Sequence, residues 1–170
     1  MEDRPKLIVR PTLFDHFIEW LGYALLAATF IWAGSMYFTL PDTIPVHFNI
    51  KGEADAYGGK LHILALPFVS AVLLVGMTIL NRYPWVFNYP VKISSDNALR
   101  HYTAAVRLIR WLKLSIVTVF FLIVLGMTTS ASEGKFAMGT WLLPAILLIV
   151  NLPLVIYLIS VFSKPNRTKQ

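Results

Sequence analysis

The sequence contains no cysteine and few charged residues. The absence of cysteine excludes disulfide bonds, thiol catalysis and thiolate metal sites. Only 14% of the residues are Asp, Glu, Lys or Arg, whereas soluble domains typically carry about 25%. The common catalytic motifs HExxH and GxSxG are also missing from the sequence. Because 56% of the chain is hydrophobic and charge is so scarce, we expect an integral membrane protein.

Long apolar segments account for most of the chain. Four segments lack Asp, Glu, Lys and Arg, and they lie between Glu19 and Asp42, Lys60 and Arg82, Lys113 and Glu133, and Lys135 and Lys164. Each is close to or longer than the roughly 20 residues that a helix needs to cross a bilayer. Their apolar runs are continuous rather than alternating, which excludes barrel strands. We predict an all-α integral membrane protein, one domain over residues 1–170, with spans at about 14–40, 61–80, 108–130 and 139–162.

The basic residues indicate the orientation of these spans. Twelve of the fifteen Lys and Arg residues fall in the amino-terminal arm, the middle connector and the carboxyl terminus, since only Lys51, Lys60 and Lys135 lie elsewhere. The positive-inside rule therefore predicts that both termini are cytoplasmic and that residues 41–60 face outward. An outward face without cysteine fits a bacterial cytoplasmic (inner) membrane. The net charge of +6 is thus interpreted as an orientation signal, and no nucleic-acid partner is expected.

The loop over residues 41–60 is too specific in composition for a simple connector. Pro41 and Pro45 restrict the backbone at its start, and three glycines follow. We expect a short strand at 46–48 and a turn at 49–52. The loop also carries polar groups that could bind a ligand, and the predicted ligand-binding residues are His47, Asn49, Gly52, Asp55 and Lys60.

The role of His47 has several interpretations. Its imidazole could contact a peptide, lipid or envelope ligand directly. It could also bind zinc together with Asp55 and His62, since these side chains offer acceptable nitrogen and oxygen ligands. A third possibility is a general base that Asp55 orients, although no nucleophile stands out. Finally, a hydrogen bond from His47 to Asp55 could simply hold the loop in shape.

Basic residues also gather on the predicted third helix. We expect a basic face there made of Arg100, Arg107, Arg110 and Lys113. It would contact anionic lipid headgroups or, alternatively, a cytoplasmic regulatory protein. Near the start of the first helix, Glu19 is expected to reach the headgroups. The helix interiors offer no ionisable residue for an ion path, so a transporter is the weakest interpretation.

Two further features concern the fourth helix and the loop motif. Asn151 lies near mid-membrane, and we expect it to face the bundle. Residues 40–60 resemble the pattern LPxxIPxHFNxxGxxDxxxxK. This pattern is similar to that of a bacterial membrane domain of unknown function found at the amino terminus of SdpI-type immunity proteins. The resemblance implies two roles, protection against a secreted toxin and membrane capture of a small cytoplasmic repressor.

Overall fold

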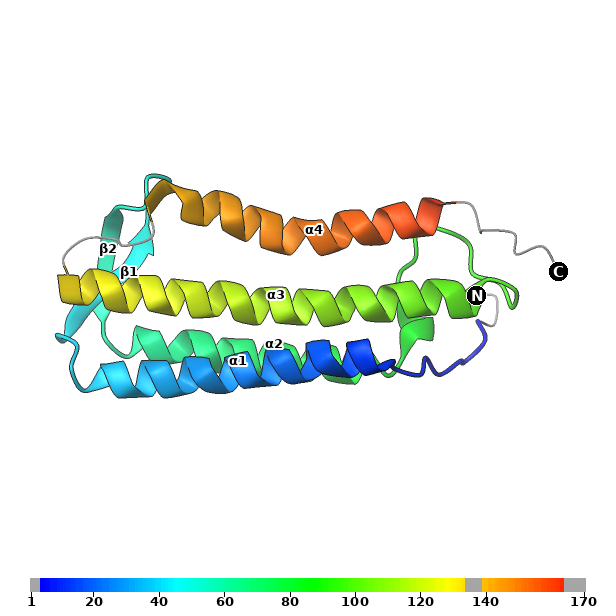
Figure 1. Ribbon diagram of the computed structural model, residues 1–170, viewed down its shortest axis with the longest axis horizontal. Coiled ribbons are helices and arrows are strands. Elements are labelled where there is room, and N and C mark those ends of the chain that lie inside the picture. The colour runs from blue at the N-terminus through cyan, green and yellow to red at the C-terminus, as the bar shows by residue number, and fades with distance from the viewer. Residues whose placement is uncertain (1–3, 134–138, 164–170) are drawn as a thin grey trace.

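The computed structural model describes residues 4–133 and 139–163, and these residues form a four-helix bundle with a small hairpin at one end (Figure 1). The elements in chain order are α1 (Leu13–Tyr37), β1 (Thr43–Phe48), β2 (Ala54–Gly59), α2 (His62–Leu80), α3 (Ala98–Glu133) and α4 (Leu142–Phe162), with single 3-10 turns at Pro84–Val86 and Gly139–Trp141. All four helices are long and apolar enough to cross a membrane. The protein is therefore a multi-pass membrane protein, as the four apolar segments predict.

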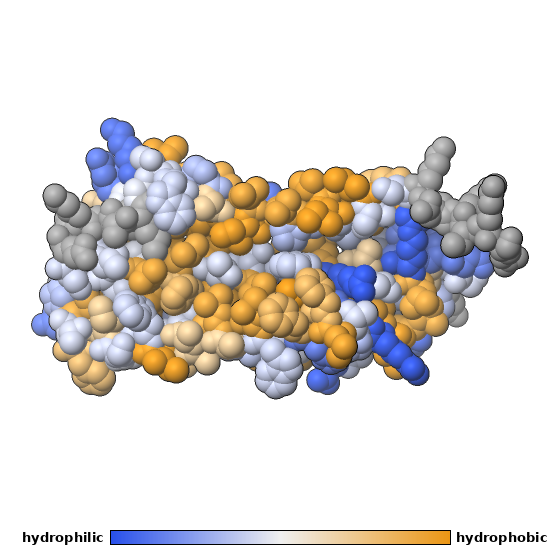
Figure 2. All heavy atoms as spheres, in the orientation of Figure 1, coloured by the Kyte–Doolittle hydropathy of each residue, from blue (hydrophilic) through white to orange (hydrophobic). Residues whose placement is uncertain are grey.

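The two ends of the bundle differ (Figure 1). We call the end with β1 and β2 the hairpin end, and the end where α1 begins and α4 finishes the terminal end. Apolar side chains cover the middle of the face seen in Figure 2, while hydrophilic ones gather toward the two ends. Helix α3 has 36 residues and is thus about 54 Å long. It exceeds the roughly 30 Å of a hydrocarbon core, so part of it extends beyond the predicted span at 108–130.

Helix α1 begins at a capping box. The Thr12 side chain accepts a hydrogen bond from the Asp15 backbone N–H, and the Asp15 carboxylate accepts one from the Thr12 N–H at 2.8 Å. Both orphan donors of the first turn are thereby satisfied. Asp15 is nevertheless buried, and this position brings it against α3.

The segment between α1 and α2 is a β-hairpin, so the all-α prediction is wrong in this part of the chain. The expected strand at 46–48 is longer, and it pairs antiparallel with β2. Helix propensity is low in β1, where Thr43, Ile44 and Val46 are β-branched. Strand β2 has the sequence ADAYGG, which carries no strand signal of its own. It is a strand because β1 offers it a partner.

The hairpin is anchored on the bundle through Ile44. This side chain is fully buried and packs in an apolar cluster that contains residues of α1, α2 and α3. The buried members of the cluster are Ala33, Leu40, Ile44, Ile63, Val124 and Met127. Burying a side chain of this size contributes about 1.5–3 kcal/mol. The hairpin is therefore held at a fixed position over the helix ends.

A second apolar cluster closes the terminal end. It gathers Tyr89 of the connector and Tyr102 of α3, whose rings are 5.6 Å apart. Arg4 donates to the Phe87 carbonyl at 2.6 Å and lies over the Tyr89 ring. Burial raises the pKa of the Tyr89 hydroxyl above its ordinary value, and this hydroxyl donates to the Pro84 carbonyl at 2.8 Å. The amino-terminal arm is thus fastened to the connector between α2 and α3.

Helix α3 is the centre of the bundle, since it packs against α1, α2 and α4. Helix α4 is curved (Figure 1) and contains Pro153. A proline cannot donate to the carbonyl four residues earlier, here that of Ile149. Ser115 of α3 donates to this carbonyl at 2.8 Å. The irregularity in α4 is therefore compensated by a hydrogen bond between the two helices.

Asn151 does not face the bundle as predicted. Its side chain is exposed, and its amide donates to the Leu147 carbonyl of the same helix at 2.7 Å. The prediction failed because a helix that is apolar all round carries no pattern that marks its inner face. Ser115 of α3 provides a polar link to α4 near this depth instead.

Candidate functional site

The exposed face of the hairpin carries a His–Asp pair. His47 Nδ1 lies 2.5 Å from Asp55 Oδ1, and the two side chains are 68% and 43% exposed. The strand register passes from Pro45 to His47 on β1, where a bulge interrupts the ladder, and it also skips Asp55 on β2. Such irregularities re-aim side chains. Here they bring together two residues that are eight positions apart in the sequence.

The pair fixes the imidazole in a defined orientation. Because Nδ1 is hydrogen-bonded to the carboxylate, Nε2 is the ring nitrogen that can bind a partner. Nε2 makes no hydrogen bond to the residues that the structure describes. A carboxylate that orients an imidazole also strengthens its second nitrogen as a hydrogen-bonding group. The His47 imidazole is therefore held in one orientation, and it remains accessible.

Asn49 and Gly52 build the turn between the strands. The Asn49 side-chain oxygen accepts from the backbone N–H groups of Lys51 and Glu53 at 2.9 and 3.0 Å, and its amide donates to the Glu53 carboxylate. Gly52 has a φ of 79°, which other residues adopt only with strain. Both were predicted to bind a ligand. The structure shows that they shape the turn, and both also line a cavity between the hairpin and α4.

Lys60 closes the other end of the hairpin. Its ammonium lies 3.1 Å from the Asp42 carboxylate and 5.2 Å from the centre of the Tyr37 ring. The Lys60 backbone N–H also donates to the Asp42 carbonyl at 3.0 Å. These contacts join the first residue before β1 to the first residue after β2. The predicted binding residue Lys60 is thus placed where it holds the base of the hairpin.

His62 does not join His47 and Asp55 as the third ligand of a metal site. Its Nδ1 lies 2.7 Å from the Gly59 carbonyl, and its ring packs on Gly58, where an added Cβ would come within 3.1 Å of Cε1. Among the described residues no three His, Asp, Glu or Cys side chains gather into a possible metal site. Zinc sites require three or four protein ligands. The predicted zinc set therefore does not fit this geometry.

A cavity adjoins the pair. It has a volume of about 330 Å³ and lies between the turn region of the hairpin and the first turns of α4. His47, Phe48 and Asn49 line it from the hairpin, and Leu142 and Ile146 line it from α4. A pocket with apolar walls and a few polar groups at one side is typical of small binding sites. The site can therefore accept an apolar group while His47 contacts a polar one.

The predicted basic face at the other end is not continuous. Arg110 and Lys113 are buried, with side chains only 10% and 4% exposed. Lys113 Nζ bonds to Glu19 at 2.5 Å, and Arg110 Nε bonds to the same carboxylate at 3.1 Å. The expectation that Glu19 contacts headgroups is therefore corrected, because its carboxylate pairs with α3. The spacing of Asp15 and Glu19, four residues apart on one helix face, could have indicated this partner.

Arg100 and Arg107 remain accessible. Arg107 is 49% exposed and its Nε lies 3.3 Å from Asp15. Arg100 donates to the carbonyls of Ser160 and Ser163 at 2.8 and 2.6 Å, so it caps the last turn of α4. A cation at this position also favours the helix dipole.

Comparison with known proteins places the hairpin in a recognised family segment. Residues 24–71 match a domain of unknown function, DUF1648. The matching segment covers the second half of α1, the whole hairpin and the first half of α2. The chain is also 34% identical over 98 residues to an uncharacterized protein of Archaeoglobus fulgidus, in an alignment that covers 53% of this chain and 48% of the relative. The chain thus spans about half the length of that relative. No solved structure matches this chain significantly.

Proposed function

We propose that this protein is a non-enzymatic, SdpI-like binding protein of the bacterial inner membrane. Its hairpin recognises a peptide, lipid or envelope component on the outer side. The observation that carries the proposal is the exposed His47–Asp55 pair beside an apolar cavity of about 330 Å³. An oriented imidazole supplies a directional hydrogen bond, and the cavity supplies apolar contact. A peptide toxin is one ligand of this kind, and immunity or signalling is the role that would follow.

The proposed orientation rests on the distribution of basic residues. With the hairpin outside and both termini in the cytoplasm, twelve of the fifteen Lys and Arg residues lie inside. A cytoplasmic regulatory protein could then reach Arg100 and Arg107. Because the chain lacks cysteine, labelling of a single introduced cysteine shows on which side of the membrane that residue lies. Lys51→Cys should react with a membrane-impermeant maleimide in intact cells, and Ser95→Cys only after permeabilisation; the reverse pattern would contradict the orientation.

The binding role is tested by photocrosslinking in cells. A photoreactive residue at Ile50, which is 75% exposed and lines the cavity, should form an adduct whose mass identifies a peptide or a lipid. The same residue at Ile8, exposed at the terminal end, is the positional control. Adduct formation should be lost in His47→Ala and Asp55→Asn and kept in Lys51→Gln, which changes an exposed charge on the same turn. Equal membrane abundance of the variants has to be verified.

Two results would refute the binding role. The first is the absence of any adduct at Ile50 beyond that seen at Ile8. The second is an Ile50 adduct that persists unchanged in both His47→Ala and Asp55→Asn, because recognition would then not depend on the pair.

The alternative is an enzyme or metalloprotein of the membrane surface that uses His47 and Asp55. The 2.5 Å contact between them is compatible with a general base and its orienting carboxylate. It receives less support than binding, because the described residues provide no third metal ligand near the pair. We therefore place binding first.

A further inference from the structure

A second and larger groove lies between α3 and α4 at the terminal end, far from the hairpin. Its volume is about 810 Å³. Residues at positions 99, 100, 103, 104, 107, 108 and 111 line it from α3. This spacing of three and four residues marks one helix face. Leu152, Pro153, Ile156, Tyr157 and Ser160 line it from α4. One face of α3 and one face of α4 therefore line the same groove.

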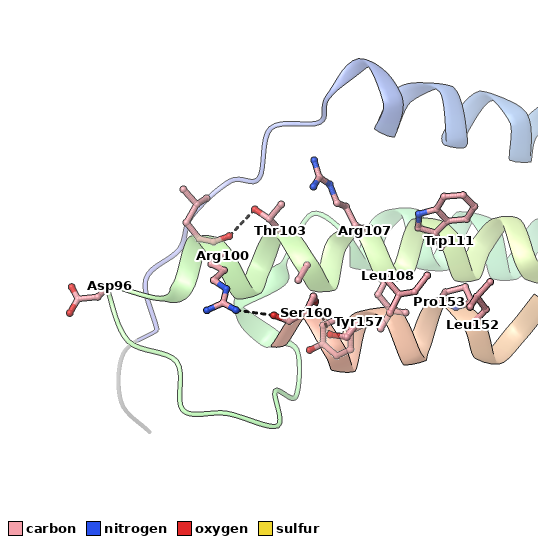
Figure 3. Close-up of a pocket in the computed structure, with 13 residues that line it drawn as sticks. Asp96, Arg100, Thr103, Arg107, Leu108, Trp111, Leu152, Pro153, Tyr157 and Ser160 are labelled. Carbon is pink, nitrogen blue, oxygen red and sulfur yellow. Dashed lines mark hydrogen bonds between the residues drawn. The ribbon is translucent and has the colours of Figure 1, made fainter. Parts of the chain in front are cut away.

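Two polar ties hold α4 to α3 on either side of the groove. One tie is the Ser115 hydrogen bond to the Ile149 carbonyl, just before Pro153. The other is Arg100, which holds the last turn of α4 through the Ser160 and Ser163 carbonyls. The groove lies between these two ties, and Figure 3 shows the Arg100 tie to Ser160. A gap between clamped helices in a membrane protein is open to lipid.

The walls of the groove change character along its length. Arg100, Thr103 and Arg107 line the part nearer the terminal end, whereas Trp111 and Leu152 line the deeper part (Figure 3). Arg100 and Trp111 are separated by about 16 Å along the helix axis, given a rise of 1.5 Å per residue. Tryptophan favours the membrane interface, so Trp111, which is 40% exposed, marks the boundary between the arginines on its outer side and the apolar Leu152. This order, polar at the membrane boundary and apolar toward its centre, is the order of groups in a phospholipid.

The charge of the groove favours an anion. Three charged residues line it, the basic Arg100 and Arg107 and the acidic Asp96, so the lining carries one net positive charge. Arg107 uses Nε for Asp15, and its two terminal nitrogens make no hydrogen bond to the described part of the chain. A guanidinium matches two phosphate oxygens at once.

We propose that the groove between α3 and α4 binds one anionic phospholipid of the phosphatidylglycerol type. The phosphate lies between the guanidinium groups of Arg100 and Arg107, beside Thr103, whose hydroxyl donates to the Leu99 carbonyl at 2.7 Å. An acyl chain runs along Leu108 and Leu152 toward the centre of the membrane. Asp96, at the open end of the groove, accepts hydrogen bonds from the headgroup hydroxyls. The proposal is independent of the hairpin and of its ligand.

The test is native mass spectrometry of the full chain in detergent with added phosphatidylglycerol or phosphatidylcholine of identical acyl chains. One phosphatidylglycerol should be retained at least about tenfold more tightly than phosphatidylcholine, because a charge-assisted contact of this kind is worth about a factor of ten or more. Arg107→Gln should remove this preference. Arg82→Gln, which removes an exposed charge at the same end outside the groove, should leave it unchanged.

A second pair of variants keeps every charge. Ala104→Phe fills the groove and should abolish retention of phosphatidylglycerol, whereas Val155→Phe, on an exposed part of α4 that does not line the groove, should not. Circular dichroism verifies that each variant is folded. If Arg107→Gln does not fold, the Ala104→Phe result alone decides.

Four outcomes would overturn the proposal. Equal retention of the two lipids would remove the anion preference, and equal weakening by Arg82→Gln and Arg107→Gln would reduce it to general surface charge. Undiminished retention in folded Ala104→Phe would place the lipid elsewhere. Equally tight binding of the water-soluble glycerophosphoglycerol headgroup would make the ligand a free phosphate ester rather than a membrane lipid.

Discussion

The buried ion pair between α1 and α3 gives a quantitative prediction. The Glu19 carboxylate accepts from Lys113 at 2.5 Å and from Arg110 at 3.1 Å, and the Lys113 side chain is only 4% exposed. Glu19→Ala leaves both cations without this partner. Breaking a buried pair from one side costs about 3–5 kcal/mol. We expect the lower end, about 3 kcal/mol, because Lys113 keeps its 3.0 Å hydrogen bond to Thr78 and Arg110 keeps Asp15.

The free-energy cost of the unpaired cation can be separated from the loss of packing in Glu19→Ala. In Glu19→Ala combined with Lys113→Met, the unpaired ammonium is gone, so the double variant should be more stable than Glu19→Ala alone. The exposed pair between Asp42 and Lys60 is the control, since Asp42 is 96% exposed. Asp42→Ala should cost at most about 1 kcal/mol.

The assay is reversible unfolding in mixed micelles, with helicity followed by circular dichroism as the denaturing detergent is increased. If Glu19→Ala costs no more free energy of unfolding than Asp42→Ala, the reasoning is refuted. The reasoning is also refuted if the double variant with Glu19→Ala and Lys113→Met is less stable than Glu19→Ala alone. Either result would mean that water or lipid headgroups reach the pair and that its burial in the bundle carries no penalty.

Three further predictions use the same unfolding assay or a direct analysis. Ser115→Ala leaves the Ile149 carbonyl without its partner and should cost about 1–2 kcal/mol; a loss within error would show that the tie between α3 and α4 is dispensable. Gly52→Ala places a side chain on a residue with a φ of 79°, so it should destabilise the hairpin by about 1–2 kcal/mol. The loss is measured as faster amide hydrogen exchange in the hairpin. Gly34→Ala is the control, because the space around an added Cβ is open there and no such loss is expected. Treatment with a chelator should leave the Ile50 adduct unchanged, and stoichiometric zinc that is lost in His47→Ala would instead support the metalloprotein.

The sequence was informative about the helices because a membrane imposes a strong constraint. Every backbone polar group in the hydrocarbon region has to be bonded within its own segment, so long uncharged runs predict helices with little ambiguity. The predicted spans at 61–80 and 139–162 accordingly agree with α2 and α4 within a few residues. Strand β2 escaped prediction because ADAYGG has no periodic pattern. Its conformation depends on β1, which a local pattern cannot express.

The polar sites were predicted less well, for a related reason. A hydrogen bond between His47 and Asp55 is one interpretation of the sequence, and the structure contains this contact. A turn at 49–52 is likewise predicted, and Asn49 and Gly52 shape it. The bulged register that brings the His47 and Asp55 side chains together has no signal in the sequence pattern. Lys113 shows the same limit at the terminal end. A cation near the end of a span suits lipid headgroups as well as a buried carboxylate, and only the packing of α1 on α3 decides between them.

The packing of α1 on α3 also distinguishes these helices and α2 from α4. Glu19 and Lys113 lie at the ends of the uncharged segments, and they join α1 to α3 and, through Thr78, to α2. Helix α4 takes no part in these ion pairs among the described residues and is tied to α3 by Ser115 and Arg100. Helices α1 and α3 thus share the ion pairs, and α2 joins them through the Thr78 hydrogen bond. Helix α4 lines both the groove at the terminal end and the pocket beside His47, so we expect the loss of either tie to affect the nearer of these two cavities.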